Sequence, residues 1–388
     1  MNIGMGTSDK PVALFVWGDL PLGGAERRFF RLFNYLQNNG HNVRLYTSDE
    51  GAAACRSLDI FLDRKNVHVF PRLQESKYRL IRYLSLIRLT FSLVRQVRAD
   101  GIRHLHFGEN PGALSFLYAL VSQYACSFSV SLVDSIKDYQ RSNREKVFAA
   151  IAAKFSNRID CLSDQIKADL CLFLGKGHES KCLVSPCSFT ERKVMEAAPK
   201  RDIDISFIGR MIPTKGHRLL KNALVDLGRA SRSGLVIHVC GSGPLEQEIR
   251  QEFGAIKNQI LHIHYEDNPF QILLRTKIYV ALQEIENYPS QSLLEAMTCG
   301  CAIVATDVGL TRRLLDESCA ILIPAEPAAL AEALMRLLDN EALRCELGQS
   351  AENVVTSKHT IETFADYFLT DLCGMKLHRL ESGVASRI

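Results

Sequence analysis

Short apolar runs alternate with longer helical patterns along nearly the whole chain, and this alternation constrains the fold most. Each apolar run is long enough for a buried strand, and each helical pattern is long enough to cross back over a sheet. This order favours parallel sheets that are covered by helices. At 388 residues the chain is too long for one ordinary core and suits two domains of similar size.

The apolar runs fall into two series, separated by an irregular, proline-containing segment that suits an interdomain hinge. The first series predicts strands at 12–17, 43–48, around Val67, around Leu105, and in runs ending at Asp134 and Ser163. The second series predicts strands at 204–210, 235–241, 260–265, 278–282, 302–306 and 320–324. We therefore expect an α/β protein with two doubly wound, Rossmann-like domains. Their predicted bounds are 1–185 for the N-terminal domain, 186–203 for the hinge, 204–370 for the C-terminal domain and 371–388 for a tail.

Charge and cysteine usage exclude several classes of protein. Lys and Arg total 47 against 43 Asp and Glu, and a formal charge of +4 is too mild for a nucleic-acid-binding protein. The 12 Cys form no CxxC pair and no Cys/His spacing suited to zinc, so we expect no metal or other cofactor. The chain start lacks the features of a signal peptide, and no run reaches the roughly 18 apolar residues of a membrane span. Together these features predict a cytoplasmic protein with reduced thiols.

The richest group of polar residues lies in the segment 281–309. A predicted strand there leads to Glu286, then to a proline turn, and then to a helix that begins near Ser290 and carries Glu295. Backbone N–H groups in the first turn of a helix lack partners within the helix and suit a phosphate. A carboxylate at Glu295 suits a ribose diol, although Ser292 and Glu295 also match the S-x-x-E pattern of a capping box.

Two cations follow the first strand of the second series. Arg210 comes directly after the predicted strand, and Lys215 follows on a short loop that ends at Gly216. Two cations on one strand-to-helix loop suit a diphosphate, and the alternative is a pair of solvated loop charges.

Paired glycines in two other strand-to-helix turns would let the backbone approach a ligand closely. Gly23 and Gly24 precede the first predicted helix, and the alternative for them is an ordinary turn. Gly241 and Gly243 match the first two glycines of a dinucleotide fingerprint, but Glu246 occupies the third place. That substitution argues against NAD and leaves a loop that faces a nucleotide.

The order of these motifs resembles the glycosyltransferase family 4 type, a group of retaining GT-B enzymes. The matching motifs are Gly209-Arg210 with Lys215-Gly216, the Gly241 to Pro244 turn, the run from Glu286 to Gly300, and the opening Gly23 to Arg27 turn. The resemblance covers nearly the whole chain and is densest over 204–315. It implies a GT-B fold, in which two Rossmann-like domains face a central cleft.

The resemblance also implies roles for these residues. Arg210 and Lys215 would hold the donor diphosphate, with Gly209, Gly241 and Gly243 beside them, and Glu295 would bind the ribose. Gly23 and Gly24 would lie across the cleft. The loop and helix start would contact the sugar and phosphates through Glu286, Asn287, Ser290, Gln291, Ser292 and Leu293. Family members need no essential metal, because cations and a helix dipole stabilise the charge that a metal stabilises elsewhere.

Two positions depart from the family pattern. The family carries two glutamates separated by seven residues, and counting back from Glu295 gives Asn287, with Glu286 one place early. We favour Glu286 as the functional acid, with Asn287 as the alternative and Glu284 as a weaker candidate. Relatives also carry a helper His after a strand. Here His106 is either an acceptor-side residue or a histidine of the core.

The N-terminal half is expected to bind the acceptor. Asp19, Glu109 and Asp134 end predicted strands and are candidate acceptor-side residues, with helix caps or solvated acids as the alternative. The segment 76–103 is basic and apolar and predicts a surface helix pair that would meet anionic lipids, or else helices packed on the sheet with solvated arginines. A lipid-linked sugar acceptor would suit bacterial surface polysaccharide synthesis.

The expected function is therefore a retaining transfer of a hexose-type sugar from a nucleotide-sugar to a glycan or lipid-linked acceptor. Two other interpretations stay open at this point. One is a GT-B epimerase or phosphorylase, and the other is a GT-B protein that binds a sugar nucleotide without catalysis.

Overall fold

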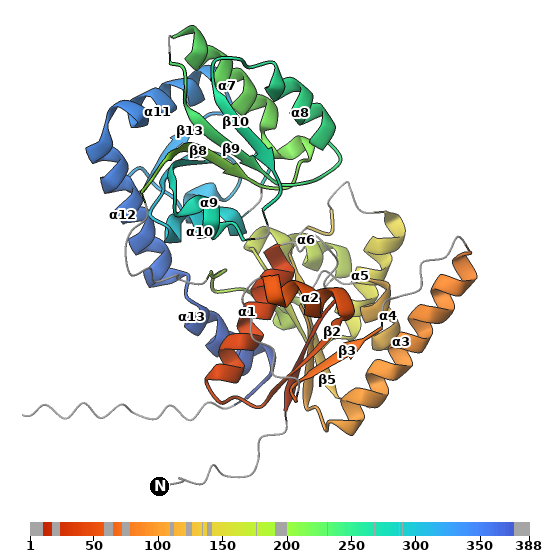
Figure 1. The fold of residues 1–388 in the computed structure, drawn as a ribbon. Coiled ribbons are helices and arrows are strands. Elements are labelled where there is room, and N and C mark those ends of the chain that lie inside the picture. Colours follow the sequence, from red (N-terminus) through yellow and green to blue (C-terminus); the bar gives the residue numbers. More distant parts are fainter. Residues whose placement is uncertain are drawn as a thin grey trace, which may run out of the picture.

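A computed structural model describes residues 11–17, 24–57, 65–71, 78–108, 112–121, 126–133, 135–137, 142–175, 177–190, 200–230, 232–266, 268–286, 288 and 290–375. Two lobes, one above the other in Figure 1, are each built on a twisted sheet with helices on both sides. All the strand pairings in both sheets are parallel. The α/β, doubly wound architecture predicted from the sequence is confirmed.

The N-terminal lobe contains a seven-stranded sheet in the order β3-β2-β1-β4-β5-β6-β7. Its strands are β1 (Val12–Val16), β2 (Val43–Ser48), β3 (Val67–Phe70), β4 (His104–Phe107), β5 (Ser127–Leu132), β6 (Arg158–Cys161) and β7 (Cys182–Val184). The helices of this lobe are α1 (Gly24–Asn38), α2 (Asp49–Ser57), α3 (Arg79–Ala99), α4 (Ala113–Val121), α5 (Asn143–Phe155) and α6 (Asp164–Leu174), with the 3-10 turn η1 (Glu179–Lys181).

The C-terminal lobe contains a six-stranded sheet in the order β10-β9-β8-β11-β12-β13. Its strands are β8 (Ile203–Ile208), β9 (Val236–Cys240), β10 (Ile260–His264), β11 (Thr276–Ala281), β12 (Ala302–Thr306) and β13 (Ala320–Ile323). The helices are α7 (His217–Arg229), α8 (Glu246–Gly254), α9 (Phe270–Leu273), α10 (Gln291–Thr298), α11 (Pro327–Asp339) and α12 (Glu341–Lys358), with the 3-10 turns η2 (Pro213–Lys215) and η3 (Thr311–Arg313).

Both faces of each sheet are buried, which explains the continuous apolar runs in the sequence. In β1, Val12, Leu14 and Val16 belong to one core cluster, while Ala13 and Phe15 belong to the cluster on the other face. Residue-by-residue alternation between two cores requires helices on both sides of the strand. The sheet is therefore the middle layer of its lobe, and ligands can reach it mainly at the loops that follow the strands.

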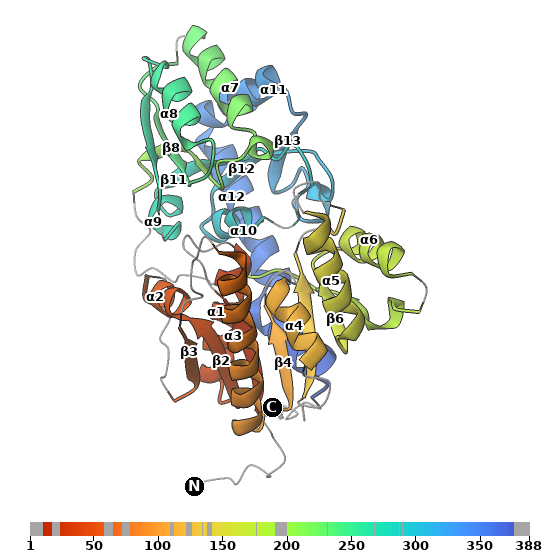
Figure 2. The same cartoon turned by 90° about the vertical axis from the view of Figure 1, so that its right-hand side faces the viewer.

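The end of the chain crosses back to the N-terminal lobe. Helix α12 leads out of the upper lobe, and α13 (Ile361–Tyr367) and the π-helical turn η4 (Phe368–Leu372) lie beside α1 (Figures 1 and 2). Phe364, Phe368 and Leu372 are buried in the same cluster as the core side of α1. The sequence-based division had assigned residues up to 370 to the C-terminal domain, whereas the packing of 361–375 is with the N-terminal sheet.

The two described ends of the expected hinge are each attached to a different lobe. Phe189 is buried with the N-terminal core, whereas the Arg201 guanidinium donates to the Cys299 carbonyl at 2.6 Å and to the Gly300 carbonyl at 3.1 Å. Residues 191–199 lie outside the described residues.

Segment 76–103 differs from its prediction. Residues 79–99 of this segment form one continuous helix, α3, where a helix pair was expected, because no glycine or proline interrupts them. None of the described helices combines the length and apolarity needed to cross a bilayer.

Candidate functional site

The topology of the C-terminal sheet brings two motif-bearing loops together. The strand order reverses between β8 and β11, which are neighbours in the sheet although two strands separate them in the sequence. Loops at such a switch point diverge to opposite faces and leave a crevice for ligands at the carboxyl ends of the strands. The loop after β8 carries Arg210 and Lys215, and the loop after β11 carries Glu286.

Hydrogen bonds join these two loops. The Lys215 ammonium donates to Gln283 Oε1 at 3.0 Å, and the Glu284 N–H donates to the Thr214 carbonyl at 3.0 Å. Arg210 is exposed, and its side chain has no hydrogen bond or ion pair with any other described residue. One cation is therefore oriented by the neighbouring loop, and the other is available to a ligand.

Three glycines make the close approach of these loops possible. Gly216 has φ 75°, and a Cβ at this position would lie 2.1 Å from the Leu282 carbonyl oxygen. Gly241 and Gly243 also have positive φ angles, and a Cβ at either would come within 2.6 Å of the backbone of 209–211. The turn formed by Gly241, Ser242 and Gly243, the GSG turn, therefore lies directly against the backbone around Arg210. A larger residue at any of these places would displace the loop.

Helix α10 begins beside the same loops. Ser290 is its N-cap, and the helix uses none of its first-turn N–H groups internally. The Tyr279 hydroxyl donates to Ser292 Oγ at 2.9 Å, which fixes the second helical residue against β11. A small pocket lies here, and its lining includes Gln283, Tyr288, Ser290, Leu293 and Thr311. Polar groups and unpaired amides at a helix N-terminus suit an anionic ligand.

Glu286 faces the N-terminal lobe. Its Oε1 accepts a hydrogen bond from Ser163 Oγ at 3.4 Å, and Ser163 caps α6 after β6. The carboxyl ends of strands from both lobes therefore meet at this point. Desolvation by burial raises the pKa of the Glu286 carboxyl, while the Ser163 hydrogen bond opposes that shift. A half-buried acid with a raised pKa at the lobe interface is typical of a functional position.

Glu295 has a partner that neither of its sequence-based interpretations included. It lies in the second turn of α10, and its carboxylate accepts a 3.0 Å hydrogen bond from Arg31 Nη1 of helix α1. Both side chains are nearly fully buried, with 3% and 1% of their surface exposed. Ser290 is the N-cap, so the capping box from Ser292 is absent. In this structure Glu295, for which a ribose contact is expected, is half of a buried ion pair between the lobes.

Helix α1 also contacts the start of α10. A Cβ on Gly24 would lie 2.9 Å from Gln291 Cβ, so a glycine is required for this approach. The Gln291 amide donates to the Phe189 carbonyl at 3.1 Å. Gln291, an expected donor ligand, therefore ties α10 to the connecting segment in this structure.

His106 lies in the core, the second of its two sequence-based interpretations. Its ring is completely buried between Ser129 and Ser131 hydroxyls, at 2.7 and 3.1 Å from its two nitrogens. Burial lowers the pKa of His106 to about 3, and the nearby Arg28 charge acts in the same direction. An inaccessible neutral imidazole cannot contact an acceptor, so the acceptor-side interpretation is not supported.

Five other expected site residues, Asp19, Gly23, Glu109, Asp134 and Asn287, lie outside the described residues.

Sequence reasoning missed the partners that position the expected residues. Arg31 holds Glu295, Gln283 holds Lys215, and Ser163 faces Glu286. One feature of the sequence indicates a partner for Arg31. Arg28 and Arg31 lie three residues apart on the apolar face of a predicted helix, and a cation that is buried on such a face needs an oppositely charged partner. Gln283 and Ser163 carry no such signal, because only the tertiary fold brings them to their partners.

Family comparisons cover both lobes. Residues 22–186 match the family described as Glycosyltransferase Family 4, and residues 188–354 match the family described as Glycosyl transferases group 1. HepE of Anabaena, solved in complex with UDP-glucose, superposes with a TM-score of 0.73 over 94% of this chain and 100% of its own, at 16% identity. A similarity at this identity shows the shared fold.

Curated relatives match over a shorter stretch. The phosphatidyl-myo-inositol mannosyltransferase of Mycolicibacterium smegmatis is 28% identical over 166 residues, which is 42% of either chain. The N-acetylgalactosamine-N,N'-diacetylbacillosaminyl-diphospho-undecaprenol 4-alpha-N-acetylgalactosaminyltransferase of Campylobacter jejuni is 24% identical over 158 residues, 39% of this chain and 42% of its own. The chain thus spans about two fifths of the length of these curated relatives. On the two family matches and the shared architecture, it belongs to the group 1, family 4 glycosyltransferases with the GT-B fold.

Proposed function

We propose that this protein is a retaining glycosyltransferase that moves a hexose-type sugar from a nucleotide-sugar donor to a glycan or lipid-linked acceptor. One observation carries the proposal: the loop after β8, which carries Arg210 and Lys215, is hydrogen-bonded to Gln283 and Glu284 of the loop after β11, at the switch point of the C-terminal sheet. Cations, unpaired helix amides and a carboxylate then surround one place where a diphosphate and its sugar would fit.

The two cations have separate tasks in this proposal. Breaking the glycosidic bond puts negative charge on the leaving diphosphate, and fixed positive charge stabilises that charge most when it does not need to reorganise. Lys215 is held by Gln283, so its ammonium is oriented before the donor arrives. Arg210 would close on the diphosphate as a planar fork with two parallel hydrogen bonds. With this charge supplied by side chains, we expect transfer to continue in the presence of a metal chelator.

The lobe contacts give a constraint on donor binding. Glu295 is occupied by Arg31, so a ribose hydroxyl can reach this carboxylate only if Arg31 shares it or the lobes separate there. Breaking a buried pair outright is costly, since it leaves a desolvated charge. We therefore propose that Arg31 keeps one Glu295 oxygen while the other accepts from the ribose.

The first test is donor turnover by Arg210→Ala. We expect kcat/KM to fall by about 100- to 1,000-fold, the usual loss when one transition-state charge stabiliser is removed. Donor hydrolysis without acceptor and transfer to added acceptor should both be measured, with UDP-, GDP- and ADP-sugars. Arg218→Ala is the matched control, because Arg218 starts α7 just beyond the loop and its exposed side chain pairs with Glu248. Equal rates for the two variants would refute the assignment of Arg210.

The second test separates Glu286 from Asn287. Glu286→Gln should lower transfer by about 100-fold while the melting temperature changes little, because its carboxyl is only half-buried and holds one long hydrogen bond. Asn287→Ala should leave the rate within a few-fold of the wild type. The reverse pattern would assign the family position to Asn287.

A lipid-linked acceptor is favoured by the surface of α3. Its first half presents a basic-apolar ridge on the outside of the lobe, in which Leu80, Leu84, Ile87 and Phe91 are 70%, 51%, 39% and 57% exposed. The exposed arginines Arg82, Arg88 and Arg95 lie on the same helix. Apolar side chains flanked by cations suit the headgroup region of an anionic bilayer. The two curated relatives named above act, by their names, on lipid-linked substrates.

The alternative proposal is a GT-B protein that binds a sugar nucleotide without turning it over. Asn at the family acid position and the occupied Glu295 favour it. Donor binding in a thermal shift assay, together with absent hydrolysis and absent transfer, would establish this alternative.

A further inference from the structure

Four side chains with metal-binding atoms occupy one face of the edge of the C-terminal sheet. β9 and β10 pair in parallel, with His238 opposite His262 and Cys240 opposite His264. Alternate residues of a strand share a face, so these four side chains form a block on the same side of the sheet. The intervening residues Ile237 and Val239 point the other way, into the main core of the lobe.

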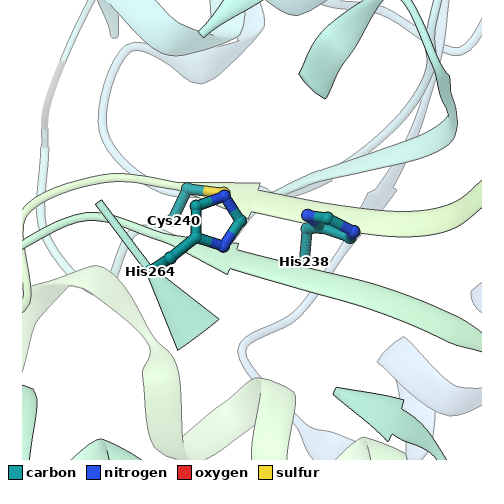
Figure 3. A group of neighbouring side chains, drawn as sticks. All are labelled: His238, Cys240 and His264. Carbon is teal, nitrogen blue, oxygen red and sulfur yellow. The ribbon is translucent and has the colours of Figure 1, made fainter. Parts of the chain in front are cut away.

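Three of the four side chains are already close enough to share an ion. The nearest ligand atoms of His238, Cys240 and His264 all lie within 4.8 Å of one another, and Cys240 Sγ is 3.6 Å from His264 Nε2. In a tetrahedral zinc site, Zn–S and Zn–N bonds of the usual lengths place sulfur and nitrogen about 3.6 Å apart. Figure 3 shows the His264 ring beside the Cys240 sulfur, with His238 to the right of both.

A second observation also indicates a ligand. His238 is 9% exposed, and its Nδ1 is buried with no hydrogen-bond partner among the described residues. Buried polar atoms are normally satisfied, so an unpaired ring nitrogen on a member of such a group needs an explanation.

Access for an ion comes from the edge of the sheet. β10 is the edge strand, His262 on it is exposed, and His264 is half-buried. The His262 and His238 rings lie 4.6 Å apart between centroids, so His262 can supply a fourth nitrogen from the solvent side. A water molecule can fill the same position.

We propose that His238, Cys240 and His264 form a binding site for a divalent zinc-type ion, with His262 or water as the fourth ligand. One thiolate and two imidazoles favour zinc over hard ions such as Mg²⁺ or Ca²⁺. The ion displaces the thiol proton of Cys240 to solvent and forms one metal–sulfur bond, so binding releases one proton. The site links the edge strand to β9 directly before the GSG turn, where the Gly241 N–H donates to the His264 carbonyl at 2.9 Å.

The sequence does not show this site. His238-x-Cys240 and His262-x-His264 are separated by a helix and lack the spacing of a zinc motif. Strand pairing alone brings the two halves together, which is why the cysteine pattern predicted no metal.

Cobalt substitution in the metal-stripped full-length protein tests the proposal. Co²⁺ should give a thiolate-to-cobalt charge-transfer band and intense visible bands of a tetrahedral site, and Zn²⁺ should abolish both. Cys240→Ser should remove the charge-transfer band, and His264→Gln and His238→Gln should each weaken Co²⁺ affinity by about 100-fold, or about 2.7 kcal/mol. Zn²⁺ should raise the melting temperature of the wild type and leave that of Cys240→Ser unchanged.

Two cysteine variants serve as matched controls. Cys345 is the exposed free cysteine among the described residues, and Cys182 belongs to a separate group of thiols in the N-terminal lobe. Cys345→Ser and Cys182→Ser should keep the full cobalt spectrum. A wild-type protein without a thiolate band, or a band that survives in Cys240→Ser, would overturn the proposal. Should Cys240→Ser fail to fold, the two histidine variants decide the same question.

Discussion

The two lobes share one architecture but differ in where the polar residues near the middle of each sheet lie. In the C-terminal lobe, the loops at the switch point between β8 and β11 are cross-bonded and present Arg210 and Lys215. In the N-terminal lobe, the strands that follow the switch carry a buried polar chain through His104, Ser129, His106, Ser131 and Asp160. One lobe carries polar groups on the loops at the end of its sheet, and the other carries them inside its own core.

The polar chain in the N-terminal lobe ends on residues that are far apart in the sequence. Asp160 accepts hydrogen bonds from Ser131, Ser185 and Tyr367 at 2.7, 2.5 and 3.0 Å, and its carboxylate lies 3.6 Å from the Arg28 guanidinium. Tyr367 belongs to α13, which arrives from the end of the chain. Asp160 therefore joins α1, the sheet and the last helix at one buried point.

The largest effect that tests this difference should come from Asp160→Ala. Removing this carboxylate leaves Arg28 buried and unpaired and deprives three hydroxyls of their acceptor, so we expect a loss of about 3–5 kcal/mol in unfolding free energy. The only tryptophan, Trp17, follows β1, so urea unfolding followed by its fluorescence reports on this lobe.

Asp204→Ala is the control in the other lobe. Asp204 also bridges strands, through Lys277 at 2.7 Å and the Val236 N–H at 2.9 Å, but both charged side chains are partly exposed. We expect a loss of about 1 kcal/mol or less. Similar losses for the two aspartates would contradict the difference between a lobe with a buried polar network and a lobe whose polar side chains are partly exposed.

Most of the strand framework was predictable from the sequence, because strands buried on both faces give continuous apolar runs. β2 and β12 were predicted with the bounds that the structure shows, while β7 was missed because three residues give no periodicity. The placement of α13 was not predictable, since its apolar residues fit a core in either lobe and only the connection through α12 decides between them.

The sequence predicts those parts of the candidate site whose residues lie close together along the chain. Arg210, Lys215 and the glycines that flank them are close together in the sequence, so one strand-to-helix turn fixes their positions. Glu295 was not predictable in the same way, because its partner Arg31 lies 264 residues away. His106 shows the same limit. In the sequence, a histidine near the end of a strand gives the same pattern whether its side chain contacts a ligand or two serines of the next strand.

A middle-sized effect should appear in the pH dependence of stability. Burial lowers the pKa of His104 and of His106 to about 3, against 6.5 for a free imidazole; His106 and Arg103 add to the shift of His104, and Arg28 adds to that of His106. Between these two pKa values the unfolded chain binds protons that the folded lobe does not bind. The free energy of unfolding therefore falls as the pH decreases below about 6.5. The slope is up to about 1.4 kcal/mol per pH unit for each ring.

Unfolding at pH 7.5, 6.0 and 5.0 measures this slope through Trp17 fluorescence. The double variant His104→Gln/His106→Gln should be less stable at pH 7.5 but should show a flatter profile between pH 6.5 and 5. His41→Gln, on the turn between α1 and β2, should keep the wild-type slope. An unchanged slope in the double variant would mean that the core histidines are not the source of the pH dependence.

The smallest effect concerns the outer surface of the N-terminal lobe. If the basic-apolar ridge of α3 lies in the headgroup region of a bilayer, Leu84→Glu should weaken binding to anionic vesicles by about 10- to 30-fold. Burial of one leucine side chain contributes about 1.5–2 kcal/mol, and the new carboxylate adds repulsion. Leu84 is half-exposed, so the variant should fold as the wild type does.

Leu172→Glu provides the control for this variant, since Leu172 is 72% exposed on α6 and this helix contains no arginine. Cosedimentation with phosphatidylglycerol vesicles at two salt concentrations separates the apolar part of the binding from the charged part, because only the charged part is screened. Equal loss in both variants would mean that exposed apolar area alone drives the binding. Loss in Leu84→Glu alone, together with weaker binding at high salt, would show that the N-terminal lobe binds membranes through the basic-apolar ridge of α3.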